Sequence, residues 1–106
     1  MNKHSVSSQE LNDAYLFGAQ IMEATNFKMS STKANKFLDY LKKEDLHDFM
    51  NELLIYVNEY KIMIPKTFID ALSDIKKAKD LGYAFACGLS VRTKKDIENF
   101  KKERLI

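Results

Sequence analysis

Hydrophobic residues recur along this chain at intervals of three and four positions, which is the spacing of one face of an α-helix. The chain contains one proline and three glycines, too few for the many turns of a β-sandwich or barrel. We therefore expect an all-α fold, a compact bundle of five to six helices that forms a single domain over residues 1–106. The pattern places these helices over residues 7–26, 30–43 and 44–60, in a short segment after Pro65, over residues 74–89, and from Thr93 onward.

Polar residues at the ends of these segments support the predicted helix boundaries. Ser7 and Glu10 have the spacing of a capping box, in which each side chain accepts a hydrogen bond from the backbone N–H of the other residue. Ser73 is placed to cap the helix that follows it. Pro65 biases Ile64 toward an extended conformation, so we expect it to stop the helical segment before it.

The segment 82–89, with the sequence GYAFACGL, places small residues at helical spacing. Ala84 and Gly88 are four positions apart and share one helix face, as do Ala78 and Gly82. A glycine inside a helix costs roughly 1 kcal/mol relative to alanine, so its presence calls for a packing or contact reason. We predict that Gly82, Ala84 and Gly88 pack closely against another helix, although such a face can also admit a nucleic-acid backbone.

Cysteine use and the absence of targeting segments indicate a soluble cytoplasmic protein. Cys87 is the only cysteine, so no internal disulfide can form, which is typical of a reducing compartment. It lies among apolar residues and has no histidine near it in the sequence, so we expect a buried, unreactive thiol. Residues 1–8 lack the apolar core of a signal peptide, and no run approaches the roughly 20 apolar residues of a membrane span.

Charge is distributed unevenly along the chain. Residues 1–75 contain eight lysines and eleven acidic residues, a net charge of −3. Residues 76–106 contain nine basic and four acidic residues, a net charge of +5. A basic end on a nearly neutral domain suggests an anionic partner, but a lysine-rich surface that contacts only water explains the pattern equally well.

Basic residues gather at both ends of the predicted helix 74–89. Lys76, Lys77 and Lys79 stand in its first turn, and Arg92 follows its end. Such residues could bind the phosphates of a nucleic-acid strand without reading its sequence. Among the aromatic residues, Tyr83 is best placed to stack on a base.

We expect no catalytic residues, no metal site and no cofactor. His4 and His47 are far apart, and neither has a second His or Cys at metal-ligand spacing. Glu44, Asp48 and Glu52 form an i, i+4 row that could bind a cation or act in acid–base chemistry, but a solvated acidic helix face is far more common. We therefore do not expect an enzyme.

Several short motifs, in this order, resemble a known family. A helix rich in Lys, Ala, Phe and Leu over residues 33–41 precedes a helix from Asp48 to Tyr60, and PKTF at 65–68, AL at 71–72 and GYAFACGL then follow. Over about residues 30–90 the chain is similar to the C-terminal helical region of the large subunit of type I-B CRISPR surveillance complexes (Cascade). That region can also be produced as a separate small subunit.

The resemblance implies an all-α bundle without enzymatic activity, present in several copies in the complex. Its partners would be the large subunit, the backbone subunits, further copies of itself, the guide RNA and the target DNA, whose displaced strand it would help to hold. In this chain the residues 51–60 contain no Lys or Arg, so strand contacts would have to come from other helices. The implied nucleic-acid-binding surface consists of basic residues on two helices: Lys33, Lys36, Lys42, Lys43, Lys76, Lys77, Lys79 and Arg92.

Two classes of function remain open. The first is a non-catalytic, nucleic-acid-binding and assembly subunit of a CRISPR interference complex. The alternative is a protein-interaction bundle without nucleic-acid binding, such as a phage-encoded regulator or scaffold, in which the segment 82–89 buries an interface between copies and the lysines only keep the protein in solution. Salt-dependent binding to single-stranded DNA distinguishes them.

Overall fold

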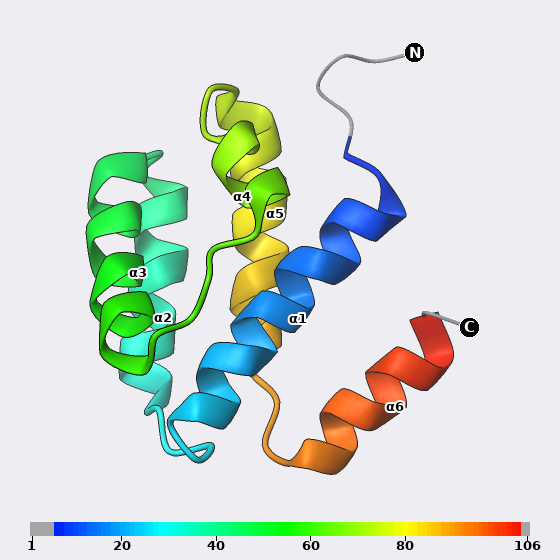
Figure 1. The fold of residues 1–106 in the computed structure, drawn as a ribbon. Helices are drawn as coiled ribbons and strands as arrows, with labels where there is room; N and C mark the ends of the chain where they lie inside the picture. The colour runs from blue at the N-terminus through cyan, green and yellow to red at the C-terminus, as the bar shows by residue number, and fades with distance from the viewer. Residues whose placement is uncertain (1–5, 105–106) are drawn as a thin grey trace.

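Between its ends, the chain folds entirely into helices and the short connections between them. The computed structural model describes residues 6–104, and His4 lies outside them. Within that range there are six helices and no strands, which confirms the expected all-α bundle. Figure 1 shows them in chain order: α1 (Ser8–Ala24), α2 (Ser31–Lys42), α3 (Leu46–Tyr60), α4 (Lys66–Ala71), α5 (Ile75–Gly88) and α6 (Lys94–Arg104).

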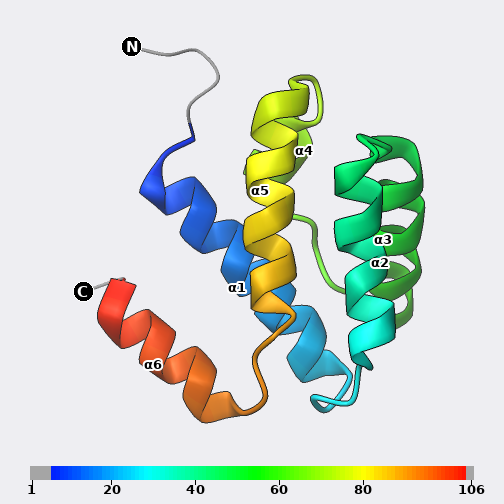
Figure 2. The same cartoon turned by 180° about the vertical axis from the view of Figure 1, so that it is seen from behind.

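Helix α5 is central to the arrangement. It packs most extensively against α1 and also contacts α2 and α4. Helices α2 and α3 pair with each other, and α3 also reaches α1. Figures 1 and 2 show α2 and α3 as a pair beside α5, while α6 extends along α1 at the opposite edge of the molecule. Among the helices described, α6 is therefore the one held mainly by a single neighbour.

Aromatic rings fill the centre of the core. Phe85 of α5 is fully buried, and its ring lies 5.1 to 5.9 Å, centroid to centroid, from those of Phe17, Phe37, Phe49 and Phe68. Three of these pairs are edge-to-face and the fourth, with Phe17, is tilted, which suits the quadrupoles of the rings. One residue of α5 thus joins four other helices.

Helices α1 and α5 cross at two glycines that face each other. A Cβ on Gly18 would lie 3.0 Å from the carbonyl carbon of Phe85 and 3.2 Å from the Cα of Gly88. A Cβ on Gly88 would lie 2.9 Å from both the backbone nitrogen of Ala19 and the carbonyl carbon of Tyr15. The obstructing atoms belong to the backbone, so at this crossing only glycine fits without a shift of a whole helix.

The other small residues of the segment 82–89 meet different neighbours. A Cβ on Gly82 would approach the Cδ2 of Leu41 in α2 at 2.6 Å. Ala84 is partly buried and lies beside the cleft between α1, α5 and α6. Gly82 and Gly88 are therefore covered by two different helices of the same chain, which leaves neither glycine open to a second copy.

The N-terminus of α1 carries the predicted capping box. The backbone N–H of Glu10 donates to the hydroxyl of Ser7 at 3.1 Å, and the backbone N–H of Ser7 donates to the carboxylate of Glu10 at 2.9 Å. The hydrogen bond from Ser7 lowers the pKa of Glu10, so the ionised form is favoured in the folded state. This contribution to stability is present above the pKa that Glu10 has in the unfolded chain, and it is lost as the pH falls through the lowered folded value.

Substitution of Ser7 by alanine is expected to destabilise the protein by about 0.5 to 2 kcal/mol, because the backbone N–H of Glu10 would no longer have a side-chain acceptor. Urea unfolding followed by circular dichroism measures this change. The matched control is Ser8→Ala, since Ser8 is the first residue of α1 and is not its cap. Equal unfolding midpoints for the two variants would contradict a stabilising role of the box.

The cap of α5 differs from the prediction. Asp74, not Ser73, is the N-cap residue, and its carboxylate accepts hydrogen bonds from the backbone N–H groups of Lys76 at 3.0 Å and Lys77 at 3.3 Å. The hydroxyl of Ser73 instead donates to the carbonyl of Asp70 at the end of α4. The short α4 ends so close to α5 that Ser73 still belongs to the preceding turn.

Helix α3 also ends differently from the prediction. Lys61 adopts a left-handed conformation, with φ of 57°, and closes the helix after Tyr60. Pro65 lies four residues later and is the N-cap of α4. The proline therefore begins the next helix, a position that suits its fixed φ and missing N–H, and does not stop α3.

Candidate nucleic-acid interface

A groove runs between α2 and the second half of α5. Its volume is about 320 Å³, and its walls include Ser31, Asn35 and Leu38 from α2. The facing wall includes Tyr83 and Cys87 from α5, and Arg92 closes one end. The two helices meet through Leu41 and Gly82, so the groove opens where their axes move apart from that contact.

Tyr83 presents an aromatic ring to this groove. Its neighbours Leu81, Gly82 and Phe85 are buried, which turns position 83 outward, and 37% of Tyr83 is exposed. Tyr83 is thus an aromatic residue of the described chain that is both partly exposed and beside basic residues. A ring in this situation is suited to stacking on a nucleobase.

An ion pair joins the lysine-rich start of α5 to the turn that follows α2. The ammonium of Lys79 lies 3.4 Å from a carboxylate oxygen of Glu44, in the turn that follows α2. An exposed pair of this kind contributes little to stability, because water screens it. The basic residue that lines the groove itself is Arg92.

The three lysines of α5 do not form one cluster. Lys79 points toward Glu44, whereas the positive charge of Lys77 acts on Glu10 at the start of α1, where it adds to the lowering of the pKa that is caused chiefly by Ser7. Successive residues of an α-helix are rotated by about 100°, so positions 77 and 79 face nearly opposite directions. Only Lys76 and Lys79 share the side of Tyr83.

The basic residues of α2 are divided in the same way. Lys33 lines a different hollow together with Glu59 and Tyr60 of α3, and Lys36 follows it by three positions on that side of the helix. Lys42 follows Leu38 by four positions and so shares the side that borders the groove. Lys43 is exposed at the helix end. Of the predicted basic surface, Arg92 lines the groove, and helical spacing puts Lys42, Lys76 and Lys79 on the sides of α2 and α5 that carry its walls.

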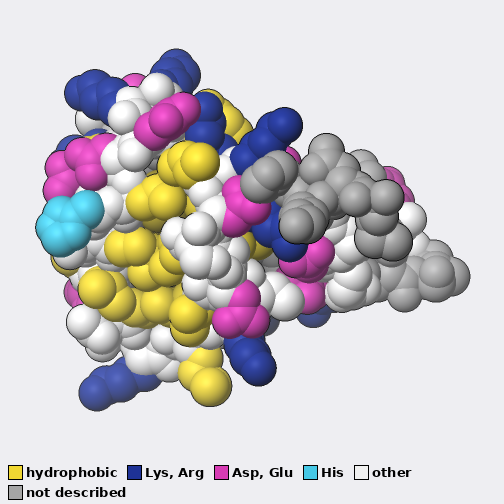
Figure 3. Space-filling model, turned by 90° about the horizontal axis from the view of Figure 1, so that it is seen from above, with side chains coloured by type: hydrophobic (Ala, Val, Ile, Leu, Met, Phe, Trp, Pro, Cys, Tyr) yellow, Lys and Arg dark blue, Asp and Glu magenta, His cyan; other side chains and the backbone are white. Residues whose placement is uncertain are grey.

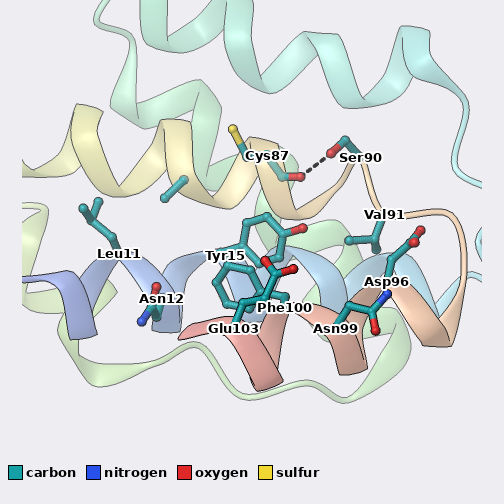
Figure 4. A pocket seen from close by; sticks show the side chains of 11 residues that line it. Leu11, Asn12, Tyr15, Cys87, Ser90, Val91, Asp96, Asn99, Phe100 and Glu103 are labelled. Atoms are coloured by element: carbon teal, nitrogen blue, oxygen red, sulfur yellow. Dashed lines mark hydrogen bonds between the residues drawn. The ribbon is translucent and has the colours of Figure 1, made fainter. Parts of the chain in front are cut away.

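Cys87 is exposed, and the prediction of a buried thiol is wrong. The residue follows Tyr83 by four positions and therefore continues the same outward stripe of α5. Figure 4 shows its sulfur pointing away from the rings of Tyr15 and Phe100. Apolar neighbours in the sequence indicate that a residue is buried only when they lie on the same helix face as that residue. Gly88 and Leu89 are buried, but they lie on a different face of α5 from Cys87.

A second hollow lies between α1, α5 and α6 (Figure 4). Its floor is the stacked pair of Tyr15 and Phe100, whose ring centroids are 4.0 Å apart with an angle of 13° between the planes. The carboxylate of Asp96 accepts hydrogen bonds from the backbone N–H groups of Arg92 and Thr93 at the start of α6. These contacts explain how the strongly charged α6 is held against α1.

No gathering of three or more His, Cys, Asp or Glu side chains that could hold a metal ion occurs within residues 6–104. His47 is exposed near the start of α3. No helix in this part of the chain is long and apolar enough to cross a membrane.

Comparison with known proteins leaves the family open. No family model, curated protein or solved structure matches the chain. The resemblance to the Cascade region therefore rests on the short motifs of the sequence.

Proposed function

We propose that this protein binds single-stranded nucleic acid in the groove between α2 and α5, as the non-catalytic small subunit of a type I CRISPR interference (Cascade) complex. The observation that carries the proposal is Tyr83, a partly exposed ring that lines the groove together with Arg92 and shares its side of α5 with Lys76 and Lys79. In the complex it would contact the large subunit, the backbone subunits and further copies of itself, and it would act in the cytoplasm.

The arrangement matches what a flexible strand needs from a protein. Lys and Arg side chains neutralise phosphates, and an aromatic ring that stacks on a base contributes about 1 to 3 kcal/mol whatever the base is. The stretch of α5 from Lys79 to Gly88 is roughly 14 Å long at 1.5 Å per residue, which accommodates a few nucleotides. Asn35 and Ser31 add hydrogen-bonding groups to the opposite wall. These groups hold a strand without reacting with it.

Substitution of Tyr83 by alanine is expected to weaken binding of a fluorescent oligothymidine by about 5- to 150-fold, which is the effect of removing one base-stacking ring. Reversal of Lys42 and Lys76 to glutamate should also weaken binding. It should reduce the slope of log affinity against log salt by about 0.7 for each phosphate that the protein no longer neutralises. Fluorescence anisotropy at several salt concentrations measures both effects.

The control uses a lysine of the same helix. Lys77→Glu makes the same charge change one residue from Lys76 but on the side of α5 that faces Glu10, so it should leave the salt slope nearly unchanged. The groove is not the site if Tyr83→Ala binds as wild type does and if Lys77→Glu reduces the slope as much, per reversed lysine, as the reversal of Lys42 and Lys76 does. The lysines would then act only through the total charge of the protein.

The alternative function is a protein-interaction bundle. The observation that favours it is a set of exposed hydrophobic side chains on α3 and α4, helices that contribute no residue to the lining of the groove. In this alternative the protein binds no nucleic acid, so the absence of salt-dependent binding to single-stranded DNA would favour it.

A further inference from the structure

Helix α6 differs from the other five helices in how little of it is buried. Each of α1 to α5 contains at least two buried residues, whereas no residue from Lys94 to Glu103 is buried. Within that range only Ile97 and Phe100 are half-buried. The buried hydrophobic residues of the core all precede Arg92 in the chain. The core is therefore complete without a side chain from this range.

The described contacts between α6 and its neighbours are exposed or incomplete. The ring of Phe100 stacks on that of Tyr15 with centroids 4.0 Å apart, and both residues are only half-buried. The ammonium of Lys94 lies 3.9 Å from a carboxylate oxygen of Glu23, and water screens this exposed pair. The hollow of about 630 Å³ between α1, α5 and α6 is lined by Glu103, so part of α6 borders open space and does not pack against α5 (Figure 4).

The connection between α5 and α6 divides at one peptide bond. Val91 is buried, and its backbone N–H donates to the carbonyl of Gly88 in α5. The backbone N–H groups of Arg92 and Thr93 instead donate to the carboxylate of Asp96 in α6, at 2.9 and 3.2 Å. The backbone N–H of Asp96 donates in turn to the hydroxyl of Thr93. A pivot between Val91 and Arg92 therefore breaks none of these hydrogen bonds.

We propose that α6 is a strap that opens as a unit at the junction of Val91 and Arg92, while the other five helices stay folded. A segment with few buried apolar contacts opens at a lower free-energy cost than the core does. A helix of 11 residues is marginally stable on its own, so α6 loses its helical hydrogen bonds once it is detached.

Opening changes which part of α1 is accessible. The closed strap lies along the side of α1 where Leu11 and Tyr15 line the hollow. Cys87 and Ser90 line both this hollow and the groove between α2 and α5, so the hollow and the groove are neighbours. Helix α6 therefore controls access to a half-buried ring next to the groove.

Amide hydrogen exchange of the full chain, measured residue by residue by nuclear magnetic resonance, tests the opening. The probes are the amides of residues 98–103, beyond the first turn of α6, and those of residues 81–86 in α5. We expect the α6 amides to share one protection factor, which is lower than that of the α5 amides by at least about 100-fold. Equal protection of the two helices would overturn the proposal. Protection that declines steadily toward residue 103 would also overturn it, because the helix would then fray from its end and not open as a unit.

A core variant separates the opening of α6 from unfolding of the whole chain. Leu53 of α3 is fully buried, so Leu53→Ala should lower the protection of the α5 amides by about 30-fold or more. The protection of the α6 amides should stay within about twofold of the wild-type value, since their exchange leaves the core intact. If both fall by the same factor, α6 unfolds only together with the core and the proposal is wrong. Leu53→Val makes the same comparison with a smaller loss of stability, should the alanine variant not fold.

Substitution of Phe100 by alanine tests the contact that closes the strap. Loss of the stacked ring should lower the protection of the α6 amides by about tenfold or more. The α5 amides should lose protection by no larger a factor, because only the closed state is destabilised. The control is Lys95→Ala, at an exposed position of the same helix, which should change the protection of either helix by no more than about twofold. Unchanged α6 protection in Phe100→Ala would contradict the proposal.

A dye that binds apolar surface cannot replace hydrogen exchange in this experiment. Figure 3 shows hydrophobic side chains exposed in a band at the end of the molecule where α3 begins, so the closed protein would already bind such a dye. None of the outcomes above depends on Tyr83 or on nucleic acid. The proposed strand-binding function can therefore fail while this inference stands, and the reverse also holds.

Discussion

Substitution of Gly88 by leucine is expected to destabilise the fold by about 3 kcal/mol or more, at the upper end of the range for overpacking. A Cβ at this position would already lie 2.9 Å from backbone atoms of Tyr15 and Ala19. Backbone atoms cannot turn aside as a side chain can, so α1 and α5 would have to separate. Because each 1 kcal/mol shifts the midpoint of a domain of this size by about 4 to 8 °C, thermal unfolding should shift by more than about 10 °C.

The control for this prediction lies in the same helix. Gly82→Ala introduces a methyl group that meets the end of the flexible Leu41 side chain, which can rotate away. Alanine also favours a helix over glycine by about 1 kcal/mol, so Gly82→Ala should change stability by less than about 1 kcal/mol in either direction. Gly88→Ala adds the same methyl group, but there it meets backbone atoms of α1, so this variant should be clearly destabilised. If the two alanine variants unfold at the same temperature, the close crossing of α1 and α5 does not exist.

Substitution of Phe85 by alanine is expected to cost about 3 to 5 kcal/mol, because it removes a fully buried ring at the centre of the core. Four other rings would be left without this aromatic neighbour: those of Phe17, Phe37, Phe49 and Phe68. A typical domain has a stability of only about 5 to 15 kcal/mol, so this variant should be close to unfolding. The free energy of unfolding in urea measures the change.

Two further variants show whether the effect is specific to this ring. Phe85→Leu keeps most of the apolar volume and should retain more stability than Phe85→Ala. Phe100→Ala removes a partly exposed ring of α6 that stacks on Tyr15, so its cost should be well below that of Phe85→Ala. If Phe100→Ala proves as destabilising as Phe85→Ala, the core is not organised around α5.

The candidate site shows where reasoning from sequence reaches its limit. Lys76, Lys77 and Lys79 are close in the chain, and the sequence therefore suggests one cluster. The helix instead turns Lys77 toward Glu10 of α1 and leaves Lys76 and Lys79 on the side of Tyr83. Tyr83 lies where the sequence predicts an accessible ring, because its position relative to the buried Phe85 depends only on helical geometry.

The sequence by itself predicted the all-α bundle of five to six helices and most helix boundaries, including the capping box of Ser7 and Glu10. Hydrogen bonds and side-chain pairs within a helix join residues at most four positions apart, so a local pattern contains the information that specifies them.

Only the tertiary structure decided which faces meet. The sequence does not single out Gly18, although a glycine inside α1 is the same signal that Gly82 and Gly88 give in α5. The role of Gly18 depends on the angle and position at which α1 crosses α5. Likewise, the exposure of Cys87 depends on how far α2 extends along α5. Such relations join residues far apart in the chain through the packing of whole helices. No short stretch of sequence specifies that packing, because it results from burying all the apolar stripes together.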